Sequence, residues 1–193
     1  MGVMDDAERF EPETPEEWSQ WLARNHGVAR GVWLVTPRRS SGRVTVDYET
    51  AVVEALRFGW IDSTARPLDA ERGMQWFSPR RPTSVWASSN KRRIERLRAE
   101  GRLEPAGEEA VRVARENGSW SRYDDVERLV VPDDLAGALA AAPGARDTWD
   151  RSTESARRMA LAWIAQARRP DTRQRRIDAT VERVADGRSP SPG

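Results

Sequence analysis

Hydrophobic residues in the first half of the chain recur with helical spacing in two places. Trp18, Trp21 and Leu22 stand at i, i+3 and i+4, which predicts a helix with one buried face. Thr14 is suited to cap its start, because a threonine side chain can accept a hydrogen bond from the first helical turn. Asp47 is suited to cap a second helix in the same way, and the apolar residues that follow it favour that helix.

Three shorter stretches carry the β-branched and aromatic residues that are typical of strands. They are residues 31–38, 60–65 and 73–78. We expect them to form one small antiparallel three-stranded sheet, with the two helices packed on it. Residues 14–90 are therefore predicted to combine helix and sheet.

From residue 90 onward the pattern predicts helices only, so the fold class is α+β with a mostly helical C-terminal half. The helix over residues 152–167 has the most regular apolar repeat. Trp163 stands in the middle of that repeat, so we expect it to be a core residue. The predicted helices begin near Asn90, Pro105, Pro132, Pro143, Ser152 and Asp171.

The length of 193 residues is enough for one domain, which we place at residues 14–187. It would have a helix and sheet part, 14–90, and a helical part, 91–187. Residues 1–13 and 188–193 lack a periodic apolar pattern and are expected to be flexible tails.

Composition excludes several kinds of site. The chain has no cysteine, so it forms no disulfide and no thiolate site. Its net charge is +1, which gives no argument for nucleic-acid binding from bulk electrostatics. It shows neither a secretory signal nor an apolar stretch of about 18 residues, so we expect a cytoplasmic protein.

The most distinctive stretch runs from residue 58 to residue 90. Pro79 and Pro82 bracket Arg80 and Arg81 and hold them on a stiff, extended segment, where neighbouring side chains point to opposite sides. A planar guanidinium group suits a carboxylate or phosphate. The candidate ligand-binding residues are Trp60, Asp62, Trp76, Phe77, Arg80, Arg81, Trp86 and Asn90.

Each of these residues also has a purely structural interpretation. The aromatic residues could wall a pocket or could be the core of a small sheet. Asp62 lies two residues after Trp60 and so shares its face of the strand. It could be a pocket acid, or it could be the ion-pair partner of Arg80 or Arg81.

The sequence of this stretch resembles a known bacterial family. The pattern F-G-W-I-D at residues 58–62, followed by F-S-P-R-R-P-x-S-x-W-x-x-x-N at residues 77–90, is similar to the YdeI/OmpD-associated, or bacteriocin-protection, family. Residues 31–34, 101–107 and 168–177 also resemble that family. The resemblance covers residues 10–187 and implies protection against antimicrobial peptides or other envelope stress, without implying a chemical activity.

A second group of arginines surrounds the start of the last predicted helix. Cations there oppose the helix dipole, which suggests a nearby anion or acidic surface. Pairing with the acidic N-terminal segment or simple solvation is the simpler explanation of these arginines. The possible anion or nucleic-acid contacts are Arg168, Arg169, Arg173 and Arg176.

Three functions stay open. The sequence favours a non-catalytic binding or protection protein whose Trp- and Arg-lined pocket takes a small molecule or peptide with an anionic or aromatic group. The second is an enzyme that acts on an anionic substrate through Asp62 and Arg80 or Arg81, although the chain has one histidine and none of the G-x-S-x-G, Walker, G-x-G-x-x-G or H-E-x-x-H motifs. The third is nucleic-acid binding through the basic helices. The sequence predicts no metal site and no cofactor.

Overall fold

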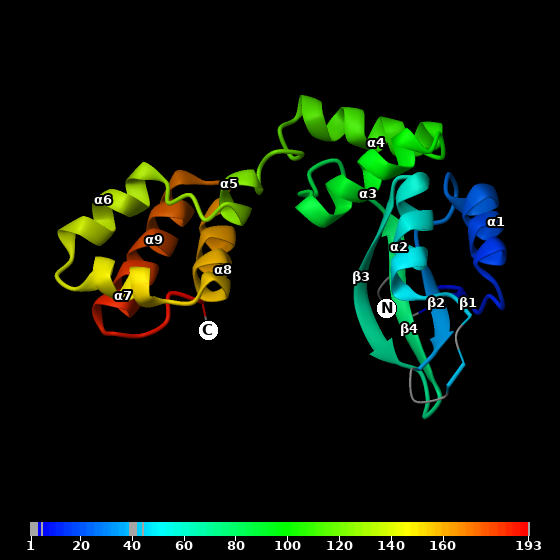
Figure 1. The fold of residues 1–193 in the computed structure, drawn as a ribbon, viewed down its shortest axis with the longest axis horizontal. Coiled ribbons are helices and arrows are strands. Elements are labelled where there is room, and N and C mark those ends of the chain that lie inside the picture. The colour runs from blue at the N-terminus through cyan, green and yellow to red at the C-terminus, as the bar shows by residue number, and fades with distance from the viewer. Residues whose placement is uncertain (1–3, 5, 39–41, 44, 193) are drawn as a thin grey trace. The chain divides into compact units, whose positions relative to one another are not determined.

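The computed structural model describes residues 4, 6–38, 42–43 and 45–192. The chain divides into two compact units, and each is described by itself (Figure 1). Unit 1 comprises residues 1–84 and 89–119, and unit 2 comprises residues 85–88 and 120–193. Whether residues 14–187 fold as one domain stays a prediction.

Unit 1 contains a four-stranded sheet with the order β1-β2-β4-β3. Strand β4 pairs with β2 and β3 in antiparallel fashion, while β1 pairs with β2 in parallel, with Arg9 opposite Trp33. The prediction of a three-stranded, purely antiparallel sheet was therefore wrong. The strands are β1 (Arg9–Phe10), β2 (Val32–Pro37), β3 (Trp60–Pro67) and β4 (Arg72–Pro79).

The missed strand, β1, lies in the segment that we expected to be a flexible tail. It is only two residues long, so it has no alternation that a strand pattern could reveal. Its parallel partner is 24 residues away in the sequence, and local spacing carries no information about such a pairing. The other three strands begin and end close to the predicted positions.

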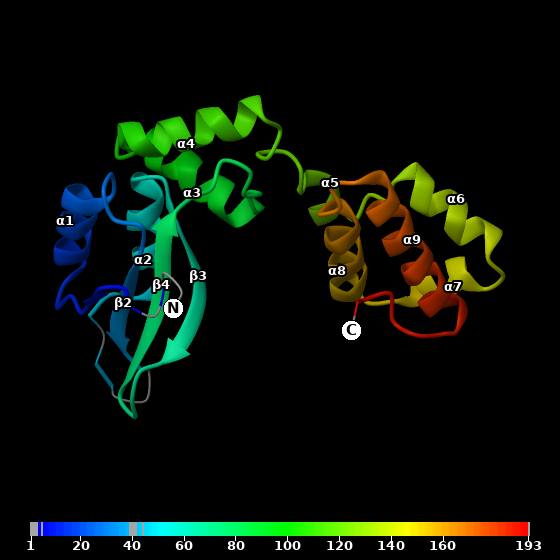
Figure 2. The same cartoon turned by 180° about the vertical axis from the view of Figure 1, so that it is seen from behind.

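Helices α1 and α2 lie on one side of this sheet, as the front and back views agree (Figures 1 and 2). Thr14 caps α1, because its hydroxyl accepts a hydrogen bond from the Glu17 backbone N–H over 3.3 Å, and Asp47 caps α2 through Thr50. Both caps confirm the sequence prediction. The helices of this part are α1 (Pro15–Asn25), α2 (Tyr48–Arg57), α3 (Ser88–Ala99) and α4 (Pro105–Glu116).

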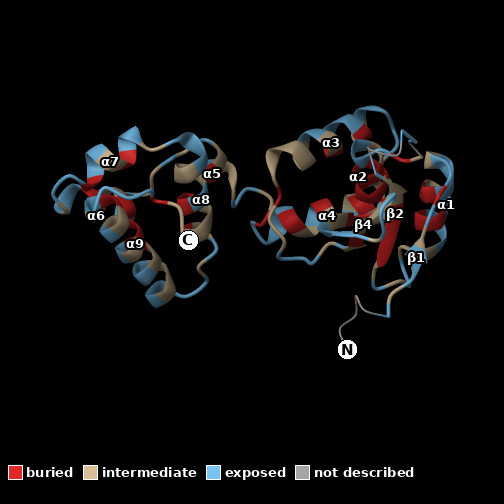
Figure 3. Ribbon diagram, turned by 90° about the horizontal axis from the view of Figure 1, so that it is seen from below, coloured by how far each residue is buried: buried red, intermediate tan, exposed pale blue. Residues whose placement is uncertain are grey.

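Aromatic side chains fill the layer between α1 and the sheet. The Trp18 and Phe77 ring centroids are 5.3 Å apart, and Trp21 meets Trp60 edge-on at 5.8 Å. The buried residues gather on β2, β4 and the inner sides of α1 and α2 (Figure 3). Trp60 and Phe77 are therefore part of the core of unit 1.

Helix α4 approaches the end of α2 very closely at Gly107. A Cβ atom at this position would lie 2.4 Å from the carbonyl oxygen of Arg57 and 2.9 Å from that of Leu56. The Glu104 backbone N–H also donates to the Arg57 carbonyl oxygen over 3.2 Å. Only a residue without a side chain allows this contact between two backbones.

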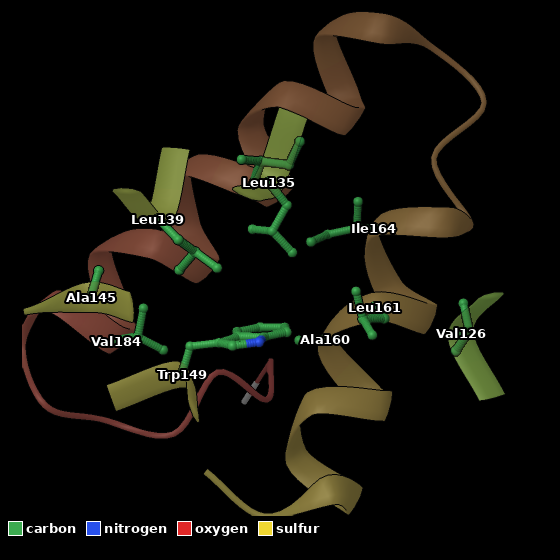
Figure 4. Packing of buried hydrophobic residues seen from close by; sticks show 10 residues of the cluster. Val126, Leu135, Leu139, Ala145, Trp149, Ala160, Leu161, Ile164 and Val184 are labelled. Atoms are coloured by element: carbon green, nitrogen blue, oxygen red, sulfur yellow. The ribbon is translucent and has the colours of Figure 1, made fainter. Parts of the chain in front are cut away.

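Unit 2 is built from helices around one hydrophobic core (Figure 4). The Trp149 indole, 1% exposed, lies in the middle of this core, with Val184 on one side and Ala160 on the other (Figure 4). The sequence predicted all of these helices except α5. They are α5 (Asp124–Glu127), α6 (Asp133–Ala141), α7 (Ala145–Arg151), α8 (Glu154–Ala165) and α9 (Pro170–Ala185).

The buried side of α8 differs from the predicted one. Ala160, Leu161 and Ile164 are buried, whereas Trp163 is half-buried and Met159 is 50% exposed. The prediction that Trp163 occupies the middle of the buried face was wrong. Residues 159–165 are all apolar, so their spacing fits several rotations of the helix equally well, and packing in unit 2 selects the one that buries Leu161.

None of the helices in the described part of the chain has the length and apolar character that crossing a lipid bilayer requires.

Candidate functional site

Unit 1 contains a cavity of about 450 Å³ between the sheet and the first turn of α2. Most of its wall is apolar, including the buried residues Leu34, Val46 and Phe77. The lining residues are Leu34, Thr36, Pro37, Arg38, Val46, Tyr48, Ala51, Ala65, Arg66, Pro67, Gly73, Met74, Gln75 and Phe77. This volume is in the range of small-molecule sites.

Two polar side chains in this wall are held by Asp62. The Tyr48 hydroxyl donates a hydrogen bond to Oδ2 of Asp62 over 2.9 Å, and Nε2 of Gln75 reaches the same oxygen over 3.4 Å. Partial burial and the hydrogen bond to Asp62 raise the pKa of Tyr48 above its ordinary value. The register of β3 against β4 shifts between Asp62 and Ala65, and such bulges aim side chains next to functional sites.

Arg80 and Arg81 differ in burial, as the alternation of side chains along their extended segment predicted. Arg80 is half-buried, and burial lowers its pKa to about 10, while the charge of Asp62 opposes that change. Arg81 is exposed. Asp62 therefore lies within electrostatic reach of Arg80, and Arg81 faces solvent.

Helix α3 adds a further cation to this part of unit 1. Nε of Arg93 donates to Oε1 of Glu49 over 3.0 Å, and its Nη1 donates to Oδ1 of Asn90 over 2.7 Å. The hydrogen bond to Glu49 raises the pKa of Arg93, and Asp62 contributes to the same change. Asn90, a predicted site residue, thus orients a cation that is influenced by Asp62.

The predicted aromatic residues do not share one wall. Trp76 and Phe77 are neighbours on β4, so they point to opposite faces of the sheet, and Trp76 packs edge-on against Trp33 at 5.3 Å. Trp86 belongs to unit 2, where its ring centroid lies 4.9 Å from that of Trp120. Phe77 lines the cavity.

Sequence reasoning missed three polar residues of this region: Tyr48, Gln75 and Arg93. Tyr48 is the first residue of α2 and looked like ordinary helix surface, and Gln75 lay inside a predicted strand without standing out. Strand alternation could have found Gln75. It is two residues from Phe77 on the same face, and that face also carries Asp62 through the pairing of Asp62 with Phe77.

Two members of the second arginine cluster, Arg173 and Arg176, are engaged within unit 2, and Arg168 and Arg169 are exposed. Nε and Nη2 of Arg173 bind Oδ2 and Oδ1 of Asp134 over 2.6 and 3.0 Å. The Arg176 guanidinium lies over the Trp163 ring at 5.2 Å and also donates to the Trp163 carbonyl oxygen. Asp134 in the first turn of α6 is thus one acidic partner of this cluster.

The pair between Asp134 and Arg173 should be visible in the acid stability of the protein. Arg173 lowers the pKa of Asp134, so the pair stabilises the fold above the ordinary aspartate pKa and is lost as pH falls through the lowered value. We expect Asp134→Asn to cost less than about 1 kcal/mol at neutral pH, because both side chains are partly exposed. In urea unfolding, the difference from the parent protein should shrink as pH falls below the ordinary aspartate pKa.

Asp133→Asn is the matched control for this pH prediction, because Asp133 lies in the same helical turn and no ion pair of Asp133 is found among the described residues. Asn substitutions at both positions change the helix-dipole interaction alike. An equal loss of stability in the two variants at neutral pH would contradict a contribution from Arg173.

Among the described residues, no group of three or more His, Cys, Asp or Glu side chains is arranged to hold a metal ion.

In the comparison with known proteins, the N-terminal and C-terminal parts of the chain match two different family models. Residues 10–110 match the family model of a domain of unknown function, DUF8412, and this range includes the F-G-W-I-D motif and the arginine pair. Residues 128–187 match the model described as bacteriocin-protection, YdeI or OmpD-associated, so the resemblance to that family is confirmed over this range. No curated protein and no solved structure matches. The chain therefore belongs to the DUF8412 family over residues 10–110 and carries a YdeI or OmpD-associated match in its C-terminal part.

Proposed function

We propose that the protein binds a small molecule in the cavity of unit 1. The observation that carries this proposal is the composition of the cavity wall, in which apolar side chains surround the polar groups of Tyr48 and Gln75. Small-molecule sites combine a mostly apolar surface with a few polar groups that orient the ligand. The Asp62 carboxylate, which does not line the cavity, accepts hydrogen bonds from both polar side chains and so fixes their positions.

The ligand that we propose has an aromatic or other apolar body. Leu34 and Phe77 supply a buried apolar surface for it, and Arg38 is among the lining residues and favours an anionic group on the ligand. A peptide could present the same groups through one aromatic side chain. The proposed Trp-lined pocket is thus revised to a cavity whose aromatic lining residues are Tyr48 and Phe77.

We further propose that binding is protective, because the ligand would be sequestered from its target. The support is the family matched by residues 128–187, whose description names bacteriocin protection. Binding without turnover suits the cavity wall, where the polar groups of Tyr48 and Gln75 both donate to the Asp62 carboxylate.

Nucleic-acid binding through α3 has weaker support. Arg93 and Arg96 both pair with Glu49, and Nε of Arg98 donates to Oε1 of Glu108 over 2.9 Å. Phosphate groups would have to compete with these carboxylates for the same guanidinium groups.

Binding of the aromatic anion anilinonaphthalene sulfonate tests the proposal. Ala65 is exposed on β3 and lines the cavity, so Ala65→Trp should fill part of it and weaken binding roughly tenfold or more, a change that fluorescence titration resolves easily. Thr64→Trp is the matched control, because Thr64 is the exposed neighbour that does not line the cavity. Equal affinities of the two variants for the probe would show that it binds elsewhere.

A further inference from the structure

We infer that the cavity of unit 1 selects ligands that donate a hydrogen bond, and that Asp62 sets this preference. The inference rests on the proposed function and adds the chemical class of the ligand's polar group: an O–H or N–H attached to the apolar body. It follows from counting which hydrogen-bonding groups of Tyr48 and Gln75 are already used.

The hydroxyl of Tyr48 has one hydrogen to give. Its partner, Oδ2 of Asp62, is 2.9 Å away and belongs to a carboxylate, which only accepts. The tyrosine hydrogen is therefore committed to Asp62. What Tyr48 can still offer to a molecule in the cavity is the lone pairs of its oxygen.

The side-chain amide nitrogen of Gln75 likewise already donates to acceptors of the protein. Its Nε2 lies 3.4 Å from Oδ2 of Asp62 and 3.2 Å from the backbone carbonyl oxygen of Ser63. Both partners only accept, so the nitrogen, and not the oxygen, must face them. The amide oxygen Oε1 remains for the cavity, and among the described residues no donor reaches it.

Two lining residues that can each donate and accept have thus been turned into acceptors by one carboxylate. A ligand that places an O–H or N–H group between them can satisfy Oη of Tyr48 and Oε1 of Gln75. A ligand with only an ether or carbonyl oxygen at that point would face two acceptors and gain no hydrogen bond. Asp62 does not line the cavity, so its role is to position the two side chains that do.

The test compares naphthol with methoxynaphthalene, its methyl ether, which has the same ring system without the donor. We expect the parent protein to bind naphthol roughly 3- to 10-fold more tightly, which is the effect of one net hydrogen bond. In Asp62→Ala the tyrosine hydroxyl and the glutamine amide are free to donate, so the preference should fall below about twofold. Comparing the ratio between variants cancels the difference in size between the two probes.

Ser63→Ala is the matched control, since only the backbone oxygen of Ser63 takes part, and it should keep the full preference. Tyr48→Phe and Gln75→Leu each remove one acceptor, so each should reduce the preference for naphthol. These two variants replace Asp62→Ala as the test if that variant does not fold. Circular dichroism verifies the fold of every variant.

The outcomes separate the inference from the proposed function. Equal binding of both probes to the parent protein would overturn the inference and leave the cavity as a binding site. A naphthol preference that survives in Asp62→Ala would overturn the role of Asp62. If neither probe binds the parent protein, the proposed function fails, and the inference fails with it.

Discussion

Trp149→Ala is expected to lower the free energy of unfolding by about 3–5 kcal/mol, the range for removal of a buried tryptophan side chain. The indole of Trp149 is 1% exposed and lies at the centre of the core of unit 2 (Figure 4). Helices α6, α8 and α9 contribute residues to this core and cannot close the space without moving together. Urea unfolding followed by circular dichroism measures the loss.

Trp163→Ala is the internal control for this prediction. It makes the same chemical change in the same unit, but Trp163 is only half-buried, with the Arg176 guanidinium over its ring. We expect a loss of only about 1–2 kcal/mol. Equal losses in the two variants would contradict the assignment of Trp149 as the centre of the core.

Gly107→Ala is the second substitution with a large expected effect. The added methyl group would meet the carbonyl oxygens of Arg57 and Leu56 at 2.4 and 2.9 Å, and backbone atoms at a helix end cannot move as a flexible side chain can. Overpacking of this kind costs about 1–3 kcal/mol or more. Thermal melting of the variant should show the loss directly.

Gly137→Ala should stabilise the protein, in contrast to Gly107→Ala. Gly137 lies inside α6, and no atom within 4 Å would meet its Cβ. Alanine in a helix interior is about 1 kcal/mol more favourable than glycine, so this variant should melt at a higher temperature than the parent protein. A lower melting temperature for Gly137→Ala would show that space around the Cβ does not decide these substitutions.

The local signals in the sequence predicted much of the fold. Caps at Thr14 and Asp47 and prolines at helix starts are short-range features, and they located the helices well. Strand β1 was missed because its partner is remote in the chain, and the rotation of α8 was missed because its apolar residues are continuous. Both depend on tertiary packing, which spacing along the chain does not encode.

The candidate site was predicted only in part. Asp62 emerged from its spacing with Trp60, and the two arginines separated into a half-buried and an exposed one, as an extended segment requires. The same alternation places Trp76 and Phe77 on opposite faces of the sheet, so they cannot line the same wall. This could have been inferred from the sequence alone. Tyr48 could not be found in this way, because its contact with Asp62 joins a helix start to a strand 14 residues later.

The bulge in β3 has a consequence for how the protein behaves at high concentration. In the described residues β3 is one edge of the sheet and β1, two residues long, is the other. An exposed edge is a template on which strands of other molecules can assemble into aggregates. In β3 the bulge interrupts the regular backbone, the exposed Arg66 adds charge, and Pro67 lacks an N–H. The edge that helps to shape the cavity is thereby also a poor seed for fibril growth.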